Sequence, residues 1–93
     1  MTDARYWVTY ISKREHVTGC DSVEIERVAE TSVEADGLAA MFMRNARDVM
    51  ENDASVTKCI VHVYDVETGR FPIHRTLERV GRCDGLRWLH LDE

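Results

Sequence analysis

The chain of 93 residues contains one proline and no long apolar run. Its longest apolar stretches, residues 38–43 and 59–63, fall far short of the roughly 20 residues that cross a bilayer, so we expect no membrane-spanning segment. Residues 1–5 lead directly into a strand pattern, so we expect no signal peptide and a cytoplasmic location. With 44% apolar and 31% charged residues, the chain has the composition of a soluble globular protein. We therefore predict one domain over residues 1–93.

Cysteines are few, and their spacing is uninformative about metals. Cys20, Cys59 and Cys83 are odd in number and form no C-x-x-C pair, which argues against a disulfide framework and a zinc ribbon. Reduced thiols are the simplest interpretation. Cys59 alternates with Val61 and is expected in the core, because a free cysteine packs as a small hydrophobe. Only Cys83, between Arg82 and Asp84, has even a weak case for reactivity.

Catalytic motifs are missing as well. The sequence has no G-x-S-x-G and no phosphate loop, and Ser32 and Ser55 sit at predicted element ends, where capping and turn roles account for them. His62, His74 and His90 fall on three successive predicted strands and could converge on a metal. Their spacing does not support such a site, so ordinary histidines are favoured. We predict a protein without enzymatic activity, cofactor or metal.

What the sequence does contain is one amphipathic helix between strand patterns. Thr31 and Glu34 form a capping box, which predicts a helix over residues 32–51. Apolar residues recur along it at three- and four-residue intervals and predict a buried stripe centred on Phe42. Gly37 interrupts this pattern, and we expect it to mark a close approach of the helix to a sheet. The stripe consists of Leu38, Met41, Phe42, Ala46, Val49 and Met50.

The flanking segments predict five strands, over residues 5–11, 22–30, 56–66, 70–77 and 86–91. Residues 12–21 are expected to be a polar connection. Val28 breaks the alternation of its strand, which indicates either a bulge near Arg27 or a side chain facing another molecule. Gly69 favours a tight hairpin, and Pro72 belongs at an edge, a strand start or a bulge. The fold class is thus α+β in the order ββαβββ, with one helix on a four- to five-stranded antiparallel or mixed sheet.

Large apolar side chains exceed what one helix can cover. Trp7, Tyr10, Ile60, Tyr64 and Trp88 lie on strands whose two faces are both partly apolar. An apolar sheet face needs a cover. A homodimer that buries the open face would provide one, and a different partner protein is the alternative.

Charge is unevenly distributed along the chain. Residues 15–53 hold ten acidic residues against three arginines, whereas residues 70–90 hold five arginines against two acids. The acidic part could occupy a basic surface on a partner protein. The basic part, with Phe71 and Trp88 interleaved, could instead bind phosphates. Charges that only solvate a small protein remain a third interpretation.

The carboxyl-terminal half carries a resemblance. A capped helix, a strand, a hairpin and the closing run from Asp84 to Leu89 resemble small phage-encoded anti-CRISPR proteins, especially the kind directed at the type I-F surveillance complex, which ends in a similar D-G-x-R-W hairpin. About 60 residues, from Ser32 onward, carry it. It implies a non-catalytic inhibitor in the host cytoplasm that occupies the nucleic-acid path of a CRISPR effector. The longer amino-terminal segment and the acidic middle depart from that pattern.

Together these features predict a phage or mobile-element protein that binds and inhibits a host defence complex, such as a CRISPR–Cas effector subunit. The alternative is a small nucleic-acid-binding or regulatory module that uses the basic carboxyl-terminal hairpins. The residues expected to contact a partner are Glu24, Glu26, Glu30, Tyr64, Arg75, Arg87 and Trp88.

Overall fold

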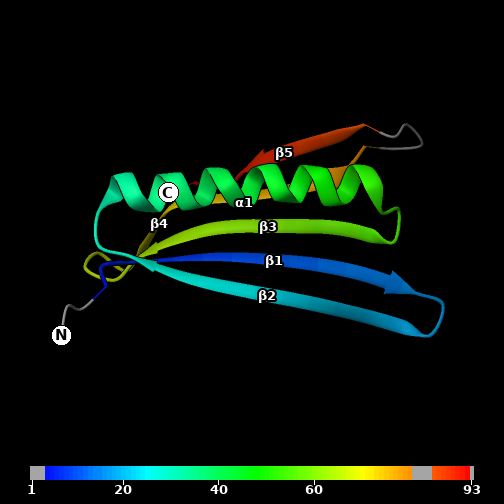
Figure 1. Ribbon diagram of the computed structural model, residues 1–93, viewed down its shortest axis with the longest axis horizontal. Helices are drawn as coiled ribbons and strands as arrows, with labels where there is room; N and C mark the ends of the chain where they lie inside the picture. The colour runs from blue at the N-terminus through cyan, green and yellow to red at the C-terminus, as the bar shows by residue number, and fades with distance from the viewer. Residues whose placement is uncertain (1–3, 81–84, 93) are drawn as a thin grey trace.

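One helix packs on a five-stranded antiparallel sheet. The computed structural model describes residues 4–80 and 85–92. Strands β1 (Tyr6–His16) and β2 (Gly19–Ala29) form a hairpin, helix α1 (Ser32–Asn52) follows, and β3 (Val56–Asp65), β4 (Arg70–Arg79) and β5 (Leu86–His90) complete the sheet. The strand order is β2-β1-β3-β4-β5, and every neighbouring pair is antiparallel. Figure 1 shows the helix lying lengthwise along the strands. The predicted α+β class and the ββαβββ order are confirmed.

The core lies between the helix and one face of the sheet. Phe42 is buried and stacks on Tyr10 with ring centroids 5.6 Å apart. Small residues on both sides of Phe42 let the helix approach the strands, because Ala35, Ala39 and Ala46 face the sheet. The buried residues of the helix are Ala35, Ala39, Phe42, Ala46 and Met50, and those of the central strands include Val8, Cys59, Val61, Val63 and Leu77. Cys59 is therefore a core residue, as predicted.

The stripe and the glycine of the helix differ from the predictions in two places. Met41 is 37% exposed, because the buried stripe runs through Ala39 and Ala35 instead. Gly37 is exposed, and a Cβ added there would meet no atom within 4 Å. The expected close approach at Gly37 is wrong. The glycine faces solvent on the outer side of the helix.

Both ends of the helix are closed by side chains. Thr31 Oγ1 accepts a hydrogen bond from the Glu34 amide at 3.2 Å, while the Glu34 carboxylate accepts from the Glu30 amide, one residue earlier than a standard capping box. At the other end, Arg79 Nη2 donates to the carbonyl oxygens of Met50, Asp53 and Val56 at 2.8, 2.9 and 3.0 Å. The guanidinium thus satisfies the Met50 carbonyl at the end of the helix and ties it to the C-cap residue Asp53 and to Val56 of β3.

The first hairpin is longer than predicted. The polar connection expected over residues 12–21 is wrong, since β1 continues to His16 and β2 begins at Gly19. The pairing is continuous from Tyr6 with Ala29 to His16 with Gly19, so no bulge occurs near Arg27. A bulge does occur further on, where the β3–β4 register shifts between Val63 and Asp65, opposite the segment that contains Pro72. Gly69 has φ 71°, as its hairpin requires.

Candidate functional site on the open sheet face

The face of the sheet turned away from the helix is left uncovered by the described parts of the chain. Side chains alternate between the two faces of a strand, so the residues between the core positions of β1 and β3 point to this side. Trp7 pairs with Tyr64, Thr9 with His62, and Ile11 with Ile60. Trp7 is 44% exposed. The face that the helix does not cover is therefore rich in aromatic and apolar groups.

An aromatic hollow lies at one end of this open face. It has a volume of about 500 Å³, and it is lined by Trp7, Thr9, Glu24, Glu26, His62, Tyr64, Gly69 and Phe71. The rings touch one another: Tyr64 and Phe71 have centroids 5.1 Å apart, and Trp7 meets Tyr64 edge-on at 6.4 Å. Thr9 is buried at 3% exposure, so it forms part of the floor. A concave, largely apolar site with a few polar groups is the usual form of a binding pocket.

Two carboxylates stand at the border of the aromatic hollow. Glu24 and Glu26 are on the open face of the edge strand β2, where they pair with Ile11 and Thr9 of β1. Neither of them forms an ion pair within residues 4–80 and 85–92. Their charges reach His62, because both raise its pKa. The hollow therefore combines aromatic walls with uncompensated negative charge.

His62 lies among the rings of the aromatic hollow. Its imidazole is 5.3 Å from the Phe71 ring and 5.7 Å from the His74 ring, measured between centroids. Burial and the neighbouring His74 lower the pKa of His62 below its ordinary 6.5, against the two glutamates. The ring is thus neutral at pH 7. Its Nδ1 atom is buried and has no hydrogen-bond partner among the described residues.

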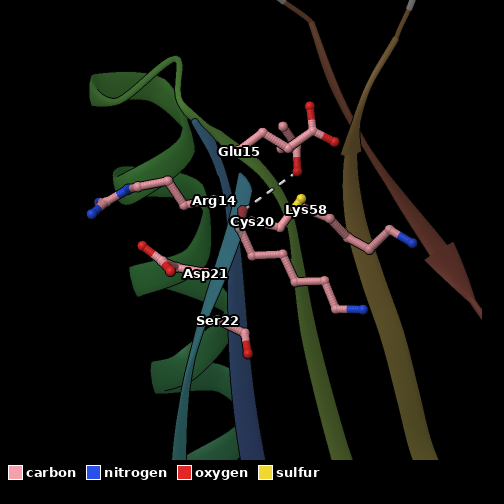
Figure 2. A pocket seen from close by; sticks show the side chains of 8 residues that line it. Arg14, Glu15, Cys20, Asp21, Ser22 and Lys58 are labelled. Carbon is pink, nitrogen blue, oxygen red and sulfur yellow. Dashed lines mark hydrogen bonds between the residues drawn. The ribbon is translucent and has the colours of Figure 1, made fainter. Parts of the chain in front are cut away.

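A second hollow, of about 330 Å³, lies where the β1–β2 hairpin meets β3. Figure 2 shows Arg14 and Asp21 on one side of the strands, with Cys20, Ser22 and Lys58 on the other. Lys58 pairs directly with Lys13, so this end of the open face is cationic. Arg14 is held by Asp53 at 2.8 Å and Asp21 by His16 at 2.7 Å. We call this site the hairpin hollow. Two of its charged side chains, those of Arg14 and Asp21, are thus held by neighbouring side chains.

The residues predicted to contact a partner are divided between the two faces. Glu24, Glu26 and Tyr64 meet in the aromatic hollow, and Glu30 lies just beyond β2, next to Glu34. Arg87 is exposed and pairs with Glu78 at 2.7 Å. In contrast, Trp88 pairs with Leu77 and packs against the core, while Arg75 reaches Met43 of the helix and binds Asp92 at 3.1 Å.

The histidines do not form a three-ligand set. His62 and His74 are neighbours across β3 and β4, but His90 pairs with Arg75, whose side chain lies on the helix side. In the described segments, no three histidine, cysteine or acidic side chains come close enough to hold a metal ion. Cys83 lies outside the described residues. Cys20 is exposed as a free thiol.

The residues predicted to contact a partner did not include Trp7 and Phe71, although Trp7 was expected on a sheet face that needs a cover and Phe71 among the basic carboxyl-terminal residues. Trp7 could have been found, because residues 7, 9 and 11 face opposite to the core positions 6, 8 and 10. Phe71 could not, because the register shift between Val63 and Asp65 decides which β4 side chains meet Tyr64. This shift has no local sequence signal beyond Pro72.

No protein-family model, curated protein or solved structure matched the chain. None of the helical segments that the structure describes is long and apolar enough to pass through a membrane.

Proposed function

We propose that this is a non-catalytic binding protein that docks a partner protein on its open sheet face. The observation that carries the proposal is the aromatic hollow, lined also by Glu24 and Glu26, which form no ion pair among the described residues. Aromatic residues are enriched at the energetic centres of protein interfaces. The helix packs on the other face of the sheet, where it forms the core, and leaves this face open.

We further propose that the partner is a subunit of a host defence complex, such as a CRISPR–Cas effector, and that binding inhibits it. Three features support this: the acidic strand β2, which complements a basic nucleic-acid path, the small size of the domain, and the resemblance of the carboxyl-terminal half to anti-CRISPR proteins. The resemblance guides the choice of the first partner to test, a type I-F surveillance complex.

The arginines weigh against the nucleic-acid alternative. Arg79 donates to three backbone carbonyls, Arg75 is paired with Asp92, and Arg87 is paired with Glu78. Phosphate binding needs cations that are free to replace counterions. These three arginines are engaged within the fold, and the net charge of −5 adds a general repulsion.

The experiment is co-expression of the tagged protein with a type I-F complex, followed by purification and a phage-interference assay. We expect a stable complex and loss of interference. Trp7→Ala should weaken both, because it removes a wall of the aromatic hollow. Met41→Ala is the matched control, since it removes a partly exposed apolar side chain from the helix. Unchanged interference without a complex would contradict inhibition of this effector.

A further inference from the structure

We propose that the aromatic hollow is a binding site for an arginine side chain of the partner protein. The guanidinium would stack on the aromatic wall and donate hydrogen bonds to Glu24 or Glu26. This inference rests on the proposed function and names the chemistry of the partner group.

The first argument is charge complementarity. Glu24 and Glu26 are separated by one residue on the same strand, so their side chains lie about 7 Å apart along it. Neither has a cationic partner in the described parts of the chain, whereas six other acidic side chains lie in ion pairs with arginines: Glu51, Asp53, Asp65, Glu67, Glu78 and Asp92. A carboxylate next to an apolar wall binds a cation more strongly than one in open water, because the wall lowers the local dielectric.

The second argument is the shape and electronic character of the wall. The hollow presents Trp7, Tyr64 and Phe71 together, and aromatic faces attract cations, tryptophan most strongly. A planar guanidinium suits such a wall better than an ammonium, because it can stack on a ring while its N–H groups form a bidentate pair with a carboxylate.

The third argument is the state of the histidine. His62 is neutral at pH 7 because burial lowers its pKa, so it adds no positive charge that would repel an arginine. Its buried Nδ1 has no hydrogen-bond partner within the described residues.

Other occupants fit the hollow less well. A nucleic-acid strand would stack on the same rings, but its phosphates would meet Glu24 and Glu26. A second copy of this chain could bring Lys13 and Lys58 from the cationic end of its own open face. It would do so only by burying two adjacent lysines, which lose more hydration than an arginine does. Both are outcomes of the test below.

The test is a titration of the 93-residue protein, uniformly labelled with nitrogen-15, with a short peptide in which two arginines alternate with glycines. The probe for comparison is the same peptide with citrulline, which keeps the shape and removes the charge. Binding is followed by NMR through the indole N–H signals of Trp7 and Trp88, assigned with Trp7→Phe. We expect the Trp7 signal to shift and the Trp88 signal to stay.

The paired variants are Glu24→Gln/Glu26→Gln at the hollow and Asp36→Asn/Glu51→Gln on the outer side of the helix. Both change the net charge of −5 by the same amount. We expect the first to weaken arginine-peptide binding by roughly tenfold and the second to leave it nearly unchanged. Equal loss in both, equal binding of the citrulline peptide, or no Trp7 shift at millimolar peptide would overturn the proposal.

Two further measurements separate the remaining outcomes. Sedimentation of the free protein that reports a dimer, with Trp7→Ala restoring a monomer, would assign the face to a second copy and overturn the arginine site. Stronger binding of a single-stranded oligonucleotide than of the peptide, lost in Trp7→Ala, would also overturn it. If the peptide binds as expected but no defence complex is inhibited, the arginine site stands and the proposed function fails. If Trp7→Ala abolishes inhibition while the peptide does not bind, the proposed function stands and the arginine site fails.

Discussion

Strand β3 supplies side chains to both faces of the sheet, and the two sets serve different ends. Cys59, Val61 and Val63 point to the helix and are almost completely buried. Ile60, His62 and Tyr64 point the other way and are only half-buried. The covered face consists of apolar groups that fit one another, whereas the open face mixes rings, a neutral histidine and carboxylates. The same strands thus build the core with one face and carry the proposed binding site on the other.

The largest expected effect concerns the covered face. Phe42→Ala removes the ring that stacks on Tyr10 and should lower the free energy of unfolding by about 3–5 kcal/mol. In a domain of this size, that is a large part of the total. Trp7→Ala, on the open face, should change it far less, because Trp7 is 44% exposed. Urea unfolding of both variants measures the difference, and equal losses would mean that the open face also supports the core.

Arg79 links the covered face to the end of the helix. Arg79→Met keeps the length of the side chain but removes the guanidinium donor from the carbonyls of Met50, Asp53 and Val56. The Asp53 carbonyl still accepts from the Val56 amide at 3.2 Å. We expect a loss of about 2 kcal/mol in unfolding free energy. Arg70→Met is the control, since Arg70 is exposed at the start of β4. A loss no greater than in the control would show that water replaces the guanidinium fully.

Alkaline pH should weaken the covered face through two buried groups, the Tyr10 phenol and the Cys59 thiol, because burial raises the pKa of both. Burial, together with a hydrogen bond to Cys59 at 3.6 Å, raises the pKa of Tyr10 to about 12. The unfolded chain releases this proton near pH 10, so between pH 10 and 12 the folded state holds more protons, and stability falls as pH rises. Urea melts from pH 8 to 11 should show this fall. Tyr10→Phe lacks one of the two titrating groups, so its slope should be shallower; identical slopes would contradict the assignment to Tyr10.

The smallest expected change is a gain on the outer side of the helix. Gly37→Ala adds a methyl group where no atom lies within 4 Å, and alanine is favoured over glycine in a helix by up to about 1 kcal/mol. A rise of a few degrees in the melting temperature should follow, with arginine-peptide binding unchanged. A lower melting temperature would mean that the helix needs the glycine for a reason outside its own backbone.

How far the sequence could predict this molecule depended on where its residues lie. Phe42 and Cys59 were placed correctly, because an element buried on one face carries apolar residues at a regular spacing in the sequence. Residues 12–16 were placed wrongly, since most of this end of the hairpin is exposed and polar side chains occupy both faces there. Residues 12–16 are held in β1 by backbone hydrogen bonds to β2 and β3. Such bonds do not depend on apolar side chains, so the pattern of apolar residues does not reveal them.

The aromatic hollow was predictable only in part. Tyr64, Glu24 and Glu26 were expected at a partner surface, and alternation along β2 and β3 places all three on one face. Their meeting with Trp7 and Phe71 depends on strand order and on the bulge in β3–β4, which are properties of the assembled sheet. Trp88 was also expected to contact a partner, but its pairing with Leu77 places it on the helix side of the sheet, against the core.

The two carboxylates on β2 also bear on how the protein keeps from aggregating. β2 is an eleven-residue strand at the edge of the sheet, and exposed edges of this length invite a second chain to add to them. If another copy added antiparallel about Ile25, Glu24 of each chain would stand opposite Glu26 of the other, and like charges in this position repel. The variant Glu24→Gln/Glu26→Gln removes that repulsion along with the arginine site. At concentrations above those of the peptide titration, it should therefore form fibrillar aggregates more readily than the parent chain.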